Sequence, residues 1–331
     1  MSGVQHLTVG REDDGMRLDR WFRQQFPQVT QGYLQKLLRK GQVRVDGTRA
    51  KAADRLSEGQ DVRVPPLPDA GERPPKPRQS LSPADRDFLN SIILYEDDDL
   101  LILNKPSGIP VQGGTKTTRH IDGLLSGLGE DADTRPRLVH RLDRDTSGVL
   151  VVAKRRQVAA KMGRMFQTRS VRKIYWAVVR GLPKPPQGKV DAALVKATTP
   201  EGDRVRAARP GEQDEAQKAV THYSVVDHAA QKFSWMSLKP VTGRQHQLRA
   251  HMAIIGHPIV SDQKYPWHDG SLPDAIENRL HLHARRITFP HPMTGKTVDV
   301  TAPLPDHMKK TFAALGFEVK AGKGADDGPG D

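Results

Sequence analysis

The stretch that decides the fold reads Leu138-Val139-His140-Arg141-Leu142-Asp143-Arg144-Asp145-Thr146-Ser147-Gly148-Val149-Leu150-Val151-Val152-Ala153-Lys154. Residues 138–139 are typical of the end of a buried strand and residues 149–153 of the start of another, because β-branched side chains favour a packed, pleated surface. Residues 146–148 are expected to form the turn between them. Two strands therefore hold a loop with one histidine, two arginines and two aspartates. A core has no use for isolated charges, so the loop is either exposed and held by ion pairs, or catalytic on a rigid scaffold.

Composition narrows the class of protein. The chain has 331 residues, which favours two domains, and a net charge of +13 from 52 basic and 39 acidic residues. This excess indicates a polyanionic partner, and nucleic acid fits better than a membrane surface because no basic amphipathic helix dominates. The absence of cysteine excludes disulfides, thiolate metal sites and a cysteine nucleophile. It also fits a cytoplasmic protein. We expect neither a signal peptide nor a membrane span.

After a leader over residues 1–15, which could include an edge strand, the sequence predicts a small helical domain over residues 16–64. Leu18, Trp21, Phe22 and Phe26 share one helical face. A second helix is expected from the N-cap Thr30 to about residue 40, followed by Gly41. Residues 43–48 then read as a hairpin with an Asp-Gly turn, and residues 61–64 as a further strand.

This domain is strongly basic. Residues 17–64 hold 11 basic and 5 acidic side chains, a net of 11 − 5 = +6. Arg39, Lys40 and Arg44 gather at the junction between the second helix and the hairpin. Such a cluster is either a solvated face or a surface that binds RNA phosphates. The helices and hairpin together resemble the S4 RNA-binding domain, which favours the second interpretation.

Residues 65–85 contain seven prolines and predict an extended linker. The large domain is expected over residues 86–316, followed by a disordered tail over residues 317–331. Strands outnumber helices there, and hairpins outnumber βαβ units. The fold class is therefore α+β, with a mainly antiparallel, mixed β-sheet flanked by helices.

Several chemistries can be weighed against the motifs. The His-Arg-Leu-Asp sequence is similar to a kinase catalytic loop, but the chain lacks a Gly-rich phosphate loop and an Asp-Phe-Gly motif. Residues 123–127 miss the Gly-x-Ser-x-Gly elbow of a hydrolase. The pairs His246/His251 and His281/His283 lack an evident third metal ligand. Thr242 and Gln245 match a capping box, which predicts a helix N-terminus at Thr242.

The combination of motifs is more specific than any one of them. Residues 140–148, the Lys173-x-Tyr175 pair and the Thr242-Gly243-Arg244-x-His246-Gln247-x-Arg249 segment occur in this order. A Tyr-Glu-Asp-Asp run at residues 95–98 leads into Asn-Lys-Pro-Ser-Gly at residues 104–108. This set resembles the RluA group of pseudouridine synthases over about residues 16–315. With the S4 domain, the likeness is to the C type, which modifies large-subunit ribosomal RNA, with the D type as near neighbour.

The resemblance implies roles for individual residues. Asp143 matches the essential aspartate, acting as nucleophile or as base toward the ribose, and Arg244 matches its ion-pair partner. Tyr175 matches the active-site tyrosine that packs on the uracil and serves in proton transfer. Arg141 matches the residue that fills the base stack after the uridine flips out. Leu282 matches an apolar wall under the base, and Lys105 and Arg249 are RNA-backbone or structural groups.

The resemblance also implies an activity. The expected reaction is isomerisation of uridine to pseudouridine in 23S ribosomal RNA, with no cofactor and no metal. We expect a monomer without an obligate protein partner and without membrane association. The alternative from another class is a non-catalytic RNA-binding factor in ribosome assembly that retains the same fold.

Overall fold

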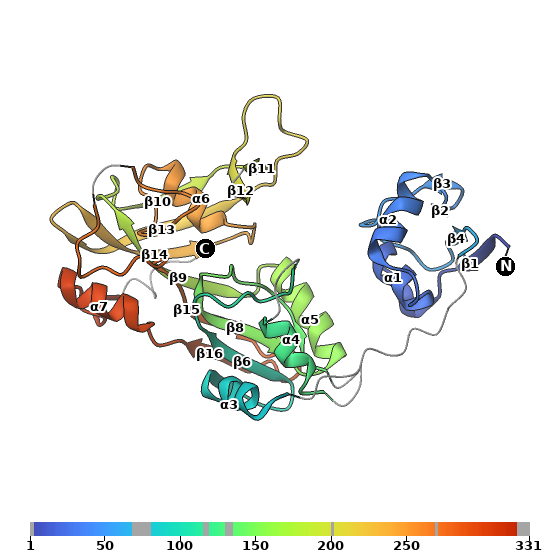
Figure 1. Ribbon diagram of the computed structural model, residues 1–331, viewed down its shortest axis with the longest axis horizontal. Coiled ribbons are helices and arrows are strands. Elements are labelled where there is room, and N and C mark those ends of the chain that lie inside the picture. Colours follow the sequence, from blue (N-terminus) through green and yellow to red (C-terminus); the bar gives the residue numbers. More distant parts are fainter. Residues whose placement is uncertain are drawn as a thin grey trace. The chain divides into compact units, whose positions relative to one another are not determined.

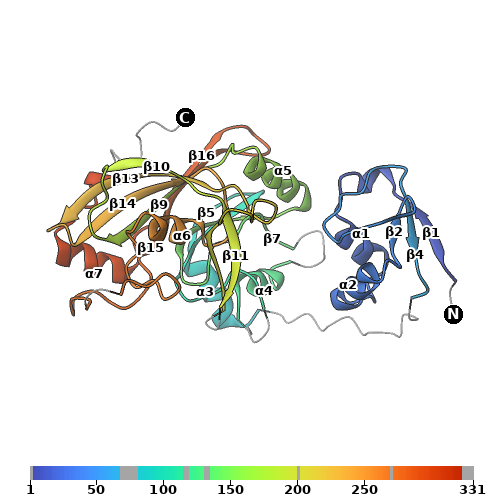
Figure 2. The ribbon, with the colours of Figure 1, turned by 90° about the horizontal axis from the view of Figure 1, so that it is seen from above.

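The computed structural model describes residues 3–67, 81–114, 119–129, 135–199, 202–268 and 271–322. The chain divides into two compact units, Met1–Arg78 and Gln79–Asp331. Residues 68–80 of the predicted linker and 323–331 of the predicted tail lie outside the described residues. Figures 1 and 2 together label the helices and strands of each unit.

The first unit combines two helices with a small sheet, as the sequence predicts. Its elements are β1 (Gln5–Thr8), a 3-10 turn (Arg11–Asp13), α1 (Leu18–Gln25), α2 (Gln31–Arg39), β2 (Arg44–Val45), β3 (Thr48–Arg49) and β4 (Asp61–Val64). The strands are ordered β1-β4-β2-β3. Thr30 caps α2, accepting a hydrogen bond from the Tyr33 amide at 3.3 Å. Asp46 and Gly47 both have positive φ, which is the turn that a two-residue hairpin requires.

The second unit is built on one large sheet. Its helices are α3 (Pro83–Ser91), α4 (Ile121–Ser126), α5 (Arg156–Gln167), α6 (Gln247–Ile254) and α7 (Asp306–Leu315). Its strands are β5 (Ile93–Glu96), β6 (Leu100–Lys105), β7 (Arg137–Leu138), β8 (Ser147–Ala153), β9 (Arg172–Arg180), β10 (Gln187–Asp191), β11 (Leu194–Thr199), β12 (Gly202–Ala207), β13 (Val220–Ala229), β14 (Phe233–Pro240), β15 (Leu282–Pro290) and β16 (Thr297–Thr301).

The order along the large sheet is β10-β13-β14-β9-β15-β8-β6-β5, with β16 beside β15 and β7 beside β8. Strands β8 and β15 pair in parallel, and the other described pairs are antiparallel. The expectation of a mainly antiparallel, mixed sheet is therefore confirmed. The hairpin β11–β12 forms a separate two-stranded ribbon whose second strand contacts α6.

Helices cover both faces of this sheet, because alternate side chains of each strand point to opposite sides (Figures 1 and 2). On β6, Leu100 and Ile102 pack in the cluster that includes α5, whereas Leu101 and Leu103 pack with α3 and α4. In the other half of the sheet, α6 and α7 contribute to separate clusters around β9 and β14. The two halves meet at β8, β15 and β9.

Three boundaries differ from the sequence-based expectations, and one alternative is settled. Strand β8 begins at Ser147, so residues 146–148 do not form the turn, which lies earlier in the loop. The leader includes the edge strand that was one of the two expected alternatives, since β1 pairs with β4 at the edge of the small sheet. Helix α3 begins at Pro83 after the cap Ser82, inside the predicted linker. The predicted tail begins too early, because Phe317 is buried in the cluster around α7.

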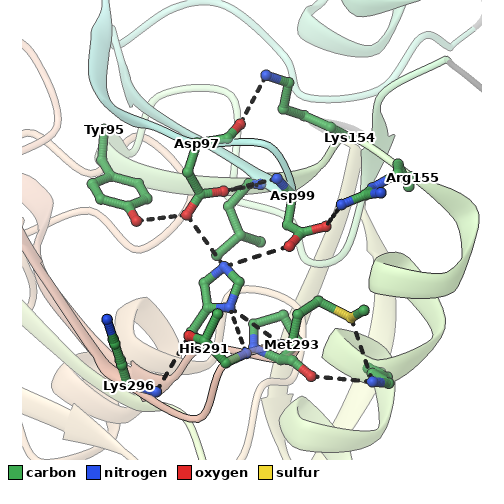
Figure 3. Close-up of polar contacts among 12 residues, drawn as sticks. Tyr95, Asp97, Asp99, Lys154, Arg155, His291, Met293 and Lys296 are labelled. Atoms are coloured by element: carbon green, nitrogen blue, oxygen red, sulfur yellow. Dashed lines mark hydrogen bonds and ion pairs between the residues drawn. The ribbon is translucent and has the colours of Figure 1, made fainter.

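A polar cluster ties three connections together at the end of β8 that is remote from residue 143 (Figure 3). The Asp97 carboxylate accepts hydrogen bonds from the Tyr95 hydroxyl at 2.5 Å and from the Leu100 amide at 2.7 Å. It also pairs with His291, on the turn between β15 and β16, at 3.2 Å. Arg155, at the start of α5, pairs with Asp99. Here the Tyr-Glu-Asp-Asp run thus has a structural role.

Candidate active site

A cavity of about 140 Å³ opens where the two halves of the large sheet meet. Its wall is made by the loop between β7 and β8, by β9, by the segment from the end of β14 into α6, and by the start of β15. The lining residues are Arg141, Leu142, Asp143, Thr146, Lys173, Tyr175, Pro240, Thr242, Gly243, Arg244, Gln245, His246, Gln247, Leu248, Arg249 and Leu282. Six of the ten predicted site residues therefore line one cavity, although they are far apart in sequence: Arg141, Asp143, Tyr175, Arg244, Arg249 and Leu282.

The loop that carries Asp143 is held from below by Lys105. This lysine is fully buried, and its ammonium donates to the carbonyls of Pro106, Ile109 and Arg144 at 2.8 to 2.9 Å. Burial lowers the pKa of Lys105 to about 7, against the opposing charges of Asp145 and Asp143. Because its amine is enclosed, the structural role expected as one alternative holds for Lys105, and the RNA-backbone role is wrong.

Other contacts fix the rest of the loop. The Val151 amide donates to His140 Nε2 at 2.8 Å, and the His140 ring stacks on Phe166. Arg144 Nε donates to the Gly108 carbonyl at 3.0 Å. Leu142 is buried in the core. The charged neighbours of Asp143 thus shape the loop, and the Asp143 carboxylate, 18% exposed, faces the cavity.

Asp143 shares a guanidinium with a second carboxylate. Arg249 Nη1 lies 3.5 Å from Asp143 Oδ2. The Nε and Nη2 atoms of Arg249 donate to the two oxygens of Asp262 at 2.7 and 2.6 Å. Burial alone would lower the pKa of Arg249, but the Asp262 hydrogen bonds and both carboxylate charges raise it. Arg249 is therefore a permanent, oriented cation beside Asp143.

The ion-pair partner expected from the resemblance was Arg244, and the structure assigns this position to Arg249 instead. Arg244 is exposed, and its Nε donates to the Lys218 carbonyl at 3.1 Å. Arg249 is 5% exposed and paired with two carboxylates, which favours the structural one of its two expected roles. The sequence did not separate the two arginines because both lie in one motif, and the backbone path between them decides which one faces Asp143.

That backbone path also corrects the predicted capping box. Helix α6 begins at Gln247, after His246 in a left-handed conformation, and not at Thr242. The Thr242 hydroxyl instead donates to Gln247 Oε1 at 2.7 Å and accepts from the Val220 amide. The turn before α6 projects Arg244 away from the helix and places His246 3.9 Å from Asp143 Oδ2.

Tyr175 and Leu282 form the apolar side of the cavity. Tyr175 lies on β9, paired with Ala284 of the neighbouring strand β15. Burial, reinforced by the charge of Asp143, raises the pKa of the Tyr175 hydroxyl, so the phenol keeps its proton near neutral pH. Leu282 is 3% exposed at the start of β15. Together they offer a flat apolar surface beside the carboxylate.

Sequence reasoning missed four residues of this environment. Lys173 and His246 line the cavity. Asp262 orients Arg249, and Tyr265 lies with its ring 5.7 Å from the Arg249 guanidinium carbon. Lys173 and His246 stand inside the quoted motifs and could have been included. Asp262 and Tyr265 lie in a segment without a distinctive pattern, and only the fold brings them to the site.

The remaining predicted RNA contacts are exposed. Arg141 is exposed at the cavity, and among the described residues its side chain makes no hydrogen bond or ion pair. In the first unit, Arg39 and Lys40 are exposed at the end of α2. Arg44 is also exposed, and it donates to the carbonyls of Gly41 and Gly47. These positions leave cationic groups available to an anionic partner.

The described part of the chain offers neither of two other kinds of site. No group of three or more histidine, cysteine, aspartate or glutamate side chains there is arranged to hold a metal ion. No helix among those residues is long and apolar enough to cross a membrane.

Comparison with known proteins gives a consistent result. A family described as RNA pseudouridylate synthase matches residues 99–254, and the S4 domain family matches residues 16–62. The chain is 37% identical over 315 residues to ribosomal large subunit pseudouridine synthase C of Pasteurella multocida (strain Pm70), covering 94% of each chain. It is 36% identical over 319 residues to the protein of that name from Escherichia coli (strain K12), covering 94% of this chain and 97% of the relative.

Solved structures show the same likeness. Human RNA pseudouridylate synthase domain containing 4 superposes with a TM-score of 0.58 at 29% identity, covering 70% of this chain and 96% of that one. Human RNA pseudouridylate synthase domain containing 1 gives 0.56 at 26% identity, covering 72% and 96%.

Proposed function

The chain belongs to the RNA pseudouridylate synthase family and carries an S4 domain, and from this premise we propose that it isomerises specific uridines of 23S ribosomal RNA to pseudouridine. The relatives that match almost its whole length are named as large-subunit synthases of the C type. The chain is thus an RNA pseudouridine synthase, and the ribosomal RNA is the substrate that these names support.

The observation that carries the proposal is the Asp143 carboxylate, partly exposed in the cavity and paired with the buried Arg249 at 3.5 Å. The reaction needs a carboxylate at this position, whether Asp143 acts as nucleophile or as base toward the ribose, and Arg249 holds a positive charge beside it. In the reaction the N1–C1′ bond breaks and a C5–C1′ bond forms. The C5 proton leaves and N1 gains a proton, so the product is an isomer of the substrate and no co-reactant is consumed.

The other cavity residues suit a uracil ring that turns between the two bonds. Tyr175 and Leu282 provide apolar surfaces on which the detached base can rotate, and the protonated Tyr175 hydroxyl can donate a hydrogen bond to it. The cavity lies inside the protein, so the uridine must leave the base stack to reach Asp143. Arg141, exposed at the rim, is placed to stack in the vacated position.

The proposal extends to the partners and the setting of the enzyme. It acts as a monomer in the cytoplasm, without a protein partner, a metal or a cofactor. The S4 unit, with Arg39, Lys40 and Arg44 exposed, supplies affinity for RNA phosphates.

The test is the Asp143→Asn variant, which keeps the shape of the side chain and removes its charge. Purified protein is incubated with large-subunit ribosomal RNA transcribed without modifications, and pseudouridines are mapped by chemical labelling and primer extension. We expect Asp143→Asn to bind this RNA with little change in Kd but to form no pseudouridine. The matched control is Asp98→Asn, which should keep full activity. Asp98 is an exposed carboxylate in the turn between β5 and β6.

A rival function is a non-catalytic factor in ribosome assembly on the same fold. That view predicts no pseudouridine from the unaltered protein at any uridine. Pseudouridine formation that survives in Asp143→Asn would instead show that the catalytic group is misassigned.

A further inference from the structure

A second cavity adjoins the one that contains Asp143. Its floor is formed by two buried apolar side chains, Leu194 of β11 and Val205 of β12, which are 3% and 5% exposed. Its rim carries Lys196, Gln217 and one carboxylate, Glu215. Arg244 and Gln245 line both cavities, so the two are continuous along this segment.

This second cavity has a fixed wall. The Tyr265 hydroxyl accepts from the Val205 amide at 3.0 Å and donates to the Val205 carbonyl at 2.8 Å. Leu194, Val205, Ala219 and Ala250 form a buried cluster beneath it, against which Tyr265 packs. The hairpin is thus attached to the same segment that holds Arg249, and the cavity exists before any ligand arrives.

Arg244 stands at the boundary between the two cavities. Its Nε donates a hydrogen bond to the Lys218 carbonyl at 3.1 Å, which fixes the direction of the side chain. Its two terminal nitrogens make no hydrogen bond or ion pair with the described residues, and the side chain is exposed. A guanidinium held at one nitrogen and free at the other two is suited to bidentate binding of a phosphate.

The chemistry of the second cavity matches a nucleotide. An apolar floor can pack against a base, amide side chains such as Gln217 and Gln245 can bond base edges, and Lys196 adds positive charge. If the first cavity holds the flipped uridine, the cation at the boundary faces the phosphate that links it to its neighbour. This step rests on the proposed function, because it takes RNA as the ligand.

We propose that the cavity under the β11–β12 hairpin is a subsite for the nucleotide next to the target uridine, and that Arg244 binds the phosphate between the two. This assignment gives Arg244 a role in place of the ion pair with Asp143. It also makes the hairpin a determinant of the sequence context in which a uridine is modified.

The test is a double cycle of one protein change and one RNA change. Binding is measured by fluorescence anisotropy in the Asp143→Asn background, with a labelled ribosomal RNA fragment around a target uridine. A neutral methylphosphonate replaces the phosphate on either side of that uridine. A lost charge-assisted contact should raise Kd roughly 10- to 100-fold at one of the two linkages.

Arg244→Gln should show the same increase in Kd with the unmodified fragment, and no further increase with the methylphosphonate at that linkage. Lys232→Ala, an exposed lysine on the turn after β13, is the control and should show the full methylphosphonate effect. An abasic nucleotide at the same side should weaken binding about fivefold or more through lost stacking.

The subsite would be overturned if Arg244→Gln and the methylphosphonate raised Kd additively at both linkages. It would also be overturned if neither methylphosphonate changed the Kd of the chain that keeps Arg244. The methylphosphonate measurement without the Arg244 change needs no variant at this position, so misfolding of Arg244→Gln cannot obscure it. The readout is binding, whereas the proposed function is judged by pseudouridine formation in the unaltered chain. The two hypotheses can therefore fail separately.

Discussion

At the scale of single residues, the position of the cation beside Asp143 depends on a second carboxylate, because the Arg249 guanidinium binds both Asp143 and Asp262. Asp262, whose side chain is fully buried, takes two of the three guanidinium nitrogens and leaves Nη1 for Asp143. Asp262 Oδ1 also accepts from the Lys264 and Tyr265 amides. Asp262 is therefore a positioning residue, because it orients the cation without lining the cavity itself.

We expect Asp262→Asn to lower kcat about tenfold or more with a smaller change in KM, since Arg249 loses the anchor that aims Nη1 at Asp143. Breaking a buried pair should also cost about 3 kcal/mol or more of folding free energy. Single-turnover kinetics on the ribosomal RNA fragment would measure the loss of rate, and thermal denaturation would measure the loss of stability separately.

Asp299→Asn is the matched control, because Asp299 forms a two-point ion pair with Arg286 on the surface. Its effect on stability should stay within about 1 kcal/mol, with kcat unchanged. Equal kcat values for Asp262→Asn and the unaltered chain would show that Asp262 does not position Arg249 for the reaction.

At the scale of elements, the parallel contact between β8 and β15 brings the two halves of the site together. Gly148 has φ of 106°, and a Cβ there would lie 2.2 Å from the Ala284 carbonyl oxygen, so only glycine permits this approach. The Ser147 hydroxyl bonds His283 Nδ1 at 2.9 Å across the same contact. The Thr-Ser-Gly end of the loop that carries Asp143 is thus a strand junction.

Two buried histidines, His283 at this junction and His281 just before β15, predict a dependence of stability on pH. Burial lowers the pKa of His283 to about 3 and that of His281 to about 4, below the ordinary value of 6.5. The unfolded chain then binds protons that the folded chain does not, so the free energy of unfolding falls as the pH drops below about 6.5. Each histidine should contribute about 1.4 kcal/mol per pH unit until its folded pKa is reached.

Urea denaturation of the full chain at pH 7 and pH 5 would measure this loss. His283→Gln should be less stable at pH 7 but should lose less free energy between the two pH values. His228→Gln, at an exposed position on β13, should lose as much as the unaltered chain. A decline in His283→Gln as steep as in the unaltered chain would contradict the assignment.

At the scale of the whole molecule, two units of different chemistry share one chain. The S4 match covers residues 16–62 and the synthase match begins at residue 99. Among the described residues, the first unit exposes the cations Arg39, Lys40 and Arg44, whereas the second unit holds Asp143, the carboxylate proposed as catalytic. Binding and chemistry should therefore respond to different changes.

We expect Arg39→Gln with Lys40→Gln to weaken binding to ribosomal RNA and to reduce the slope of log Kd against log salt by about two, because each neutralised phosphate contributes roughly one. Deletion of residues 1–64 should reduce the slope further. Lys309→Gln with Lys310→Gln is the control, since both lysines are exposed and ion-paired on α7. An unchanged slope after the deletion would exclude the S4 unit from binding.

The sequence by itself determined the elements and the chemistry of this protein. Periodicity and turn residues were enough for α1, α2 and the β2–β3 hairpin, because those structures form through contacts a few residues apart. The motifs located Asp143, Tyr175 and Leu282, which the fold gathers in one cavity.

Only the tertiary structure decided which charged side chain forms an ion pair or hydrogen bond with which partner. Arg249 and Arg244 are five residues apart in one motif, and a left-handed residue at His246 sends one toward Asp143 and the other to the neighbouring cavity. Lys105 and Asp262 likewise take their roles from carbonyls and a guanidinium that are distant in sequence. Ion pairs and hydrogen bonds depend on distances of a few ångströms between separate segments, and local sequence pattern does not specify those distances.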